Sequence, residues 1–201
     1  QRRGGKGLIG IKTKEGDIVV DSFITSTHDY IMFFTNHGKA FWLKGYKIPE
    51  GTRHAKGKAI INLLPRLEEG EDVETAIPIH EFDDEHYLVF STKKGIIKKT
   101  VLSAYSNVRV NGIRAINLDE DDELIETKLS DGKQTIMIAT ANGQACRFNE
   151  EEARPMGRVT RGVIGIRLGK DDKVVSMAVV VDEGNLITIT ENGYGKRSPI
   201  Q

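Results

Sequence analysis

Three cations and three glycines gather in the first seven residues of the chain, which read Gln1, Arg2, Arg3, Gly4, Gly5, Lys6 and Gly7. Glycine reaches positive φ and lets a backbone lie close to another surface. Backbone N–H groups in such a turn can form a concave anion nest. The chemistry that this segment suits is phosphate binding. An isolated segment of this kind is more often a flexible basic terminus, but weakened copies recur along the chain and favour the phosphate site.

Further cations lie at two recurring positions, before single glycines and after turns that join apolar runs. The candidate phosphate contacts among them are Lys44, Arg53, Lys56, Lys98, Lys99, Arg109, Arg147, Arg158, Arg161, Lys196 and Arg197. An alternative interpretation is that these cations protect exposed strand edges from aggregation. A curved row of cations suits duplex DNA, because bending needs phosphate neutralisation along an arc.

The net charge is zero, with 29 Lys and Arg against 29 Asp and Glu. Taken alone, this balance argues against a nucleic-acid binder, whose domains are usually basic. The charges nevertheless come in blocks. Six cations and no acid lie between Lys93 and Arg114, and six acids and no cation lie between Asp119 and Glu126. Blocks that alternate along the sequence become segregated in space if the chain is a repeat.

Catalysis finds little support in the sequence. The five histidines have no metal-ligand spacing, and the motifs for a nucleophilic serine, a phosphate loop or a helix-capped dinucleotide site are absent. The acidic run 119–123 lacks the glycine and spacing of a calcium loop, so we interpret it as a solvated turn. We therefore expect no catalytic residue, no metal site and no cofactor.

The expected compartment is a reducing cytoplasm. The single cysteine, Cys146, cannot form an internal disulfide. No apolar run approaches the length of a membrane helix, so we expect no membrane partner.

Two sequence elements recur with a period of about fifty residues. The first is Thr-x-x-Gly between apolar runs, with its glycines at Gly38, Gly95, Gly143 and Gly193, which are 57, 48 and 50 residues apart. This is the turn chemistry of a β-hairpin. In the second element a glycine is followed four residues later by isoleucine, an acidic turn and another apolar run; these glycines are Gly7, Gly57, Gly112 and Gly162.

The period predicts an all-β repeat protein. Units of about four short strands at this spacing are typical of a propeller-type array in which neighbouring units bury each other's faces. We expect about four blades in one repeat domain over residues 1–201, with approximate repeats at 1–51, 52–105, 106–153 and 154–201. The chain starts inside a basic segment and stops after the fourth hairpin, so we interpret it as part of a longer array.

These motifs resemble the C-terminal domain family of the gyrase A protein over essentially the whole chain. Residues 1–7 resemble the gyrase A box in its complete form. Similar stretches lie at 60–65, 98–100, 154–157, 165–168 and 192–197. The resemblance implies a β-pinwheel, a propeller-like disc usually of about six blades, to which this chain contributes about four.

The resemblance also implies function. It implies non-sequence-specific binding, bending and wrapping of duplex DNA, which directs an ATP-dependent topoisomerase to introduce negative supercoils. The implied partners are double-stranded DNA, the rest of gyrase A, and gyrase B in an A2B2 heterotetramer, in the nucleoid-associated cytoplasm. The family's catalytic tyrosine and ATPase lie outside this segment, so the chain itself is not expected to be an enzyme. The alternatives are the corresponding C-terminal domain of topoisomerase IV and a protein-interaction propeller without DNA binding.

Overall fold

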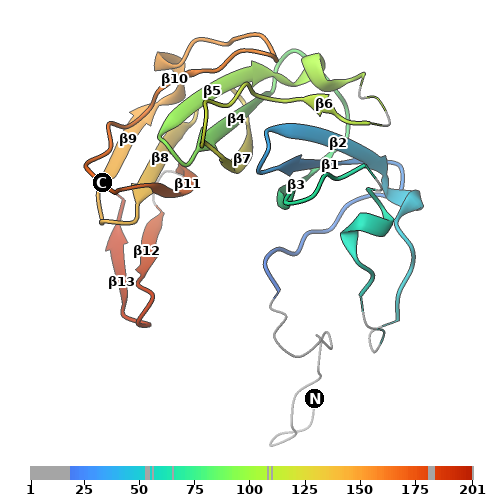
Figure 1. Ribbon diagram of the computed structural model, residues 1–201, viewed down its shortest axis with the longest axis horizontal. Helices are drawn as coiled ribbons and strands as arrows, with labels where there is room; N and C mark the ends of the chain where they lie inside the picture. The colour runs from blue at the N-terminus through green and yellow to red at the C-terminus, as the bar shows by residue number, and fades with distance from the viewer. Residues whose placement is uncertain are drawn as a thin grey trace, which may run out of the picture.

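The structure is a computed structural model that describes residues 19–52, 55, 57–64, 66–107, 109, 111–180 and 184–200. Across these residues the regular structure consists of thirteen β-strands and four short 3-10 helices. Figure 1 shows the strands gathered into sheets that follow one another along an open arc, from β1–β3 at one end to β12 and β13 at the other. The predicted all-β fold is confirmed.

The strands and helices are short, as the sequence period requires. The strands are β1 (Tyr30–Thr35), β2 (Lys39–Lys44), β3 (Val73–Ile79), β4 (Tyr87–Thr92), β5 (Ile96–Val101), β6 (Ile113–Arg114), β7 (Leu124–Ser130), β8 (Thr135–Thr140), β9 (Ala145–Asn149), β10 (Val163–Ile164), β11 (Val174–Val180), β12 (Asn185–Ile189) and β13 (Gly195–Pro199). The 3-10 helices are η1 (Gly45–Lys47), η2 (Ile60–Asn62), η3 (Leu102–Tyr105) and η4 (Glu150–Glu152).

Four antiparallel sheets contain these strands. The strand orders are β3-β1-β2-β6 in the first sheet, β10-β5-β4-β7 in the second, β11-β8-β9 in the third and β12-β13 in the fourth. The four predicted hairpins are β1-β2, β4-β5, β8-β9 and β12-β13. Their turn glycines have φ values of 72°, 83°, 83° and 79°, in the region that glycine adopts most readily.

The sheets interlock along the chain. In the first sheet the hairpin β1-β2 pairs with β3, which follows it, and with β6, which follows the next hairpin. The second sheet repeats this arrangement with β7 and β10. A four-stranded blade therefore combines three successive sequence repeats. The approximate sequence repeats and the blades therefore do not coincide, because β6 and β10 pair with hairpins of earlier repeats.

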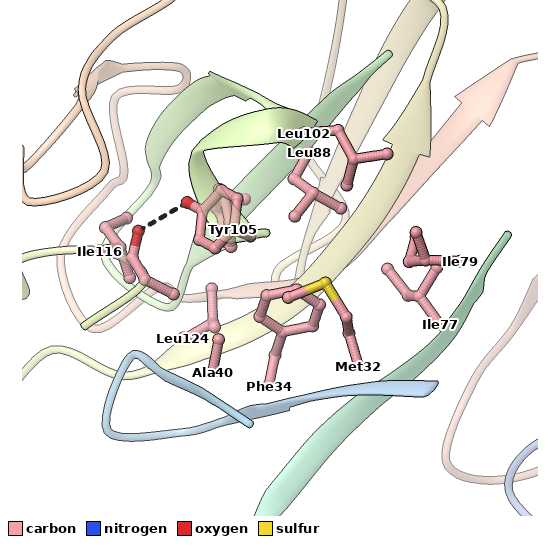
Figure 2. Close-up of a cluster of buried hydrophobic side chains, with 12 residues drawn as sticks. Met32, Phe34, Ala40, Ile77, Ile79, Leu88, Leu102, Tyr105, Ile116 and Leu124 are labelled. Carbon is pink, nitrogen blue, oxygen red and sulfur yellow. Dashed lines mark hydrogen bonds between the residues drawn. The ribbon is translucent and has the colours of Figure 1, made fainter. Parts of the chain in front are cut away.

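The core lies between neighbouring sheets. Because side chains alternate along a strand, Phe33 and Phe34 of β1 point into different clusters. Phe34 meets Phe90 of the second sheet edge-on, with ring centroids 5.5 Å apart, and Figure 2 shows this cluster closing around Tyr105. A second cluster, which includes Val89 and Ile138, lies between the second and third sheets. Sheets that bury both faces give the arc its continuity.

The acidic turns stabilise the hairpin turns of the preceding repeat. Asp122 Oδ1 accepts a hydrogen bond from the Lys94 N–H at 2.9 Å, and Asp172 Oδ1 accepts one from the Asn142 N–H at 3.0 Å. Asp122 is 8% exposed. The interpretation of 119–123 as a merely solvated turn is therefore incomplete, since one of its carboxylates satisfies a turn N–H that has no strand partner.

Candidate nucleic-acid interface

The convex side of the arc carries the two basic glycine segments that fall within the described residues, around Gly112 and Gly162. In Figure 1, β6 and β10 lie on this side, whereas β3, β7 and β11 lie toward the concave side. We call residues 109 and 111–118 the first rim segment and residues 157–168 the second rim segment. They contain β6 and β10, the outer strands of the first and second sheets. The predicted repetition of the basic segments thus becomes a row along one side of the molecule.

Glycine is required where each rim segment meets its sheet. Gly112 has φ 74°, and a Cβ there would lie 2.7 Å from the Phe41 ring. Gly162 has φ 108°, and a Cβ there would lie 2.5 Å from the Ile97 carbonyl oxygen. Both positions exclude a side chain, because the rim backbone packs directly on the strand beneath it. The structure thus gives these two recurring glycines a packing role that sequence reasoning did not assign to them.

Four predicted contacts are exposed cations. Arg109 belongs to the first rim segment, Arg147 to β9, and Lys196 and Arg197 to β13. Sequence reasoning did not select Arg114, which is also exposed, on β6. Its position just after a rim glycine was the signal that could have found it. Arg114 Nη1 donates to Asn117 Oδ1 at 3.0 Å. All five side chains are exposed, and the arginines among them carry guanidinium groups, which bind phosphate oxygens in bidentate geometry.

Lys44 and Arg158, two further predicted contacts, are held in place by neighbouring groups of the protein. Lys44 donates to the His28 carbonyl at 2.9 Å and lies 3.3 Å from the centroid of the Tyr30 ring. The Arg158 guanidinium donates to the Arg114 carbonyl at 2.9 Å. Each of these cations is therefore oriented by the protein before any ligand binds.

Arg161, another predicted contact, forms an ion pair with the acidic turn at 119–123. Its Nε donates to Asp119 Oδ2 at 2.7 Å, and both side chains are partly exposed. The expected spatial separation of basic and acidic groups therefore has an exception at this place. Asp119 occupies the guanidinium edge that a phosphate oxygen would use.

The prediction that Lys98 and Lys99 contact phosphate is not supported by the structure, because both side chains are buried. They are 0% and 3% exposed, so in this structure neither side chain presents a surface to phosphate. The Lys98 ammonium donates to the Ala115 carbonyl at 2.5 Å and to the Arg158 carbonyl. The Lys99 ammonium donates to the Glu150 carbonyl at 2.7 Å and lies 4.0 Å from its carboxylate. The reason is that β5 is covered on both faces, so adjacent residues are buried on opposite sides.

The electrostatics of Lys98 follow from its surroundings. Burial lowers the pKa of Lys98 to about 7, and the nearby Arg158 guanidinium contributes to the same shift. The two carbonyl hydrogen bonds act in the opposite direction, because they favour the charged ammonium. Lys98 is thus a costly buried group whose charge is compensated by two main-chain oxygens.

The remaining predicted contacts lie outside the described residues. They are Gln1, Arg2, Arg3, Gly4, Gly5, Lys6, Gly7, Arg53 and Lys56. Their assignment to phosphate binding stays a prediction from the sequence.

One cluster of potential metal ligands was not apparent from sequence spacing. His37, Glu68 and Glu71 bring ligand atoms within 4.8 Å of one another. The Lys39 ammonium lies 2.7 Å from Glu68 and 3.2 Å from Glu71, so a cation already balances these carboxylates.

No helix in the described part of the chain is long and apolar enough to span a membrane.

The interlocked antiparallel sheets define a propeller-like repeat protein. The model of the family described as "DNA gyrase C-terminal domain, beta-propeller" matches residues 1–26, 29–80, 86–129, 134–180 and 184–201. The chain belongs to this family.

Curated relatives agree with this assignment. The chain is 46% identical over 200 residues to the DNA gyrase A protein of Buchnera aphidicola subsp. Baizongia pistaciae, covering 100% of this chain and 24% of that protein. It is 45% identical over 203 residues to the DNA gyrase A protein of Staphylococcus epidermidis, covering 100% of this chain and 23% of that protein. The chain thus spans about a quarter of the length of these relatives.

Solved structures share the fold. The C-terminal domain of DNA topoisomerase IV aligns with a TM-score of 0.78 at 31% identity, over 85% of this chain and 53% of that one. The DNA gyrase A C-terminal domain aligns with a TM-score of 0.74 at 28% identity, over 98% of this chain and 63% of that one. The shared fold does not distinguish the gyrase A domain from the topoisomerase IV domain. The family match and the gyrase A relatives do, and they favour gyrase over the topoisomerase IV alternative.

Proposed function

We propose that this domain binds duplex DNA without sequence preference, bends it and wraps it along the convex side of the arc. In the complete enzyme the wrap directs an ATP-dependent gyrase toward negative supercoiling. The observation that carries this proposal is the row of exposed cations on the outer strands and rim segments of successive sheets, namely Arg109, Arg114, Arg147, Lys196 and Arg197. Phosphates neutralised along one side of a duplex favour bending toward that side.

The proposal includes the partners and compartment of the complete enzyme. The chain acts as a non-catalytic part of gyrase A, with gyrase B in an A2B2 heterotetramer in the nucleoid-associated cytoplasm. DNA cleavage and ATP hydrolysis belong to other parts of that assembly. Phosphate contacts position the duplex and leave base edges unread, which fits a domain that must accept any sequence.

The first experiment replaces Arg2, Arg3 and Lys6 with alanine in full-length gyrase A assembled with gyrase B. This change removes three of the predicted phosphate contacts, while the exposed cations named above remain. We expect negative supercoiling of relaxed circular DNA to be lost, with relaxation and decatenation largely kept. Bending a 20–30 base-pair site costs on the order of 1–6 kcal/mol, so the loss of phosphate contacts affects the bent state more than simple binding.

A matched control removes three exposed lysines elsewhere, Lys133, Lys170 and Lys173, which lie on turns next to β8 and β11. This triple alanine variant has the same change in charge and is expected to supercoil like the parent. Supercoiling by the Arg2/Arg3/Lys6 variant at the parental rate would contradict the role of the first segment. DNA affinity that does not change between low and moderate salt would instead favour a protein-interaction propeller.

A further inference from the structure

We propose that Lys98 is a positioning residue for the DNA-binding rim, whose buried ammonium joins the two successive rim segments and sets the spacing between their arginines. This inference rests on the proposed function, because it gives Lys98 a role only if the rim holds DNA. Lys98 itself is fully buried, so the role is exercised through the backbone of other residues.

The ammonium spans two sheets. Ala115 belongs to the first rim segment, and its N–H donates to the Gly38 carbonyl at 2.8 Å, which fixes it to the hairpin of the first sheet. Arg158 is the second residue of the second rim segment, which continues into β10 and pairs with β5, with Val163 opposite Ile97. Lys98 donates to the carbonyls of both Ala115 and Arg158. One side chain therefore ties the first rim segment to the second.

Other contacts join the same two segments but are exposed. The Asn117 N–H donates to the Thr160 carbonyl at 3.0 Å, and the Arg158 guanidinium donates to the Arg114 carbonyl. Arg161 pairs with Asp119, the residue directly after the first rim segment. Water and salt compete with contacts of this kind. The Lys98 bonds are shielded from that competition, so they are the connection that keeps its geometry when the arginines exchange their partners for DNA.

The position does not need a lysine for packing. Lys98 lies three residues after the turn glycine Gly95, and the corresponding residue after Gly38 is Phe41. Phe41 is also buried, and its ring packs against Gly112 of the first rim segment. An apolar side chain can thus fill this place in the repeat. A buried ammonium costs free energy unless it is fully hydrogen-bonded, and what it adds here is a directional bond to each rim segment.

Tyr105 supports the same carbonyl. Its hydroxyl donates to the Ala115 oxygen at 3.0 Å (Figure 2), and burial raises the pKa of Tyr105, so it stays a donor at neutral pH. The Ala115 carbonyl therefore accepts from two buried groups of the second repeat, and only Lys98 extends that connection to the second rim segment.

The test compares two DNA lengths with Lys98→Met in full-length gyrase A assembled with gyrase B. A duplex of about 10 base pairs, one helical turn, reports contact with a single rim segment. A fluorescently labelled duplex of about 150 base pairs, near the persistence length, reports bending by energy transfer. We expect the variant to lower the bent fraction of the long duplex about fivefold, within the range for coupling between packed elements, and to leave short-duplex affinity unchanged.

Leu102→Ala is the control for stability alone. Leu102 is buried in the same cluster, and it is not a hydrogen-bond partner of either rim carbonyl. It should lower the melting temperature without changing the ratio of long-duplex bending to short-duplex binding. The positioning role is overturned if the Lys98→Met variant bends the long duplex like the parent. It is also overturned if the variant lowers the affinity for both duplexes equally. A parent enzyme that does not bend the long duplex contradicts the proposed function itself and the positioning role with it.

A second measurement serves if Lys98→Met does not fold. Lys98→Gln keeps a donor on a shorter side chain. Spin labels at Arg109→Cys and Arg161→Cys, in a background in which Cys146 and any other reactive cysteine of the full-length protein are replaced by serine, report the distance between the two rim segments without DNA. A broader distance distribution in Lys98→Gln than in the labelled parent supports the positioning role, and an unchanged distribution overturns it.

Discussion

Two pairs of adjacent cations occupy the same place in the repeat and have opposite surroundings. Lys98 and Lys99 follow Gly95 by three and four residues, as Lys196 and Arg197 follow Gly193. The first pair is buried on β5, whereas the second is exposed on β13. The difference is in the neighbours, because β5 lies between β4 and β10 and β13 pairs with β12 in the described part of the chain. Pairs of cations at equivalent positions of the repeat are therefore buried or exposed according to which strands cover them.

The largest expected effect of breaking this contrast is on stability. Lys99→Met removes the buried ammonium beside Glu150, which is 1% exposed. Breaking a buried pair from one side leaves the other charge uncompensated, so we expect a loss of about 3 kcal/mol in the free energy of unfolding. Urea denaturation measures it. Adding Glu150→Gln should recover part of the loss; a stability change below about 1 kcal/mol would contradict a paired role for Lys99.

The second effect is a pH dependence that belongs to Lys98. Its folded pKa, about 7, lies below the ordinary value, so between pH 7 and about 10 the unfolded chain binds more protons and stability rises with pH. The charged and titratable groups around it are Arg158 and Tyr105. Relative to Lys98→Met, the parent should gain at most about 1.4 kcal/mol per pH unit above pH 7. Parallel stability curves for the two proteins would refute this.

The third effect concerns the exposed pair. Lys196→Met with Arg197→Met should leave the free energy of unfolding within about 0.5 kcal/mol, since both side chains are exposed. If both bind phosphate, the slope of log K against log salt should become less negative by about 1.8, or about 0.9 for each contact. Titration of a labelled duplex at several salt concentrations measures the slope. A parental slope would remove these residues from the interface.

The smallest effect tests the ion pair at the rim. Asp119→Asn releases Arg161 from its carboxylate partner and should raise duplex affinity about twofold, as exposed pairs contribute about 1 kcal/mol or less. Asp171→Asn is the control, because Asp171 is exposed in another acidic turn and its positive φ of 59° also suits asparagine. Equal gains from both variants would indicate a general charge effect rather than release of Arg161.

The sequence predicted the local features well. The four Thr-x-x-Gly hairpins depend on turn chemistry, which nearby residues determine. The pairing of β6 with β2 was not predictable in this way, since its partners are more than seventy residues apart and several strands of similar composition compete.

The sequence around Lys98 and Lys99 contains an indication that both are buried, although their charge suggests that they are exposed. Adjacent residues in a strand point to opposite faces, and the pair lies within the run Ile96, Ile97, Thr100 and Val101. Ile96 and Ile97 are adjacent, so each face of the strand carries an apolar residue, which indicates a strand covered on both faces. Two lysines in such a strand therefore need internal partners. Which partners they find depends on the neighbouring repeats, and local sequence does not contain that information.

The interlocking of the sheets has a mechanical consequence. β10 pairs with β5 in the second sheet through Val163 and Ile164, and the chain then continues into β11, which pairs along β8 in the third sheet. A pull applied to the second rim segment is therefore shared between two sheets, and the short ladder of β10 is not loaded alone. Tension along the convex side spreads from sheet to sheet, so the arc resists local peeling at the place where it is most exposed to force.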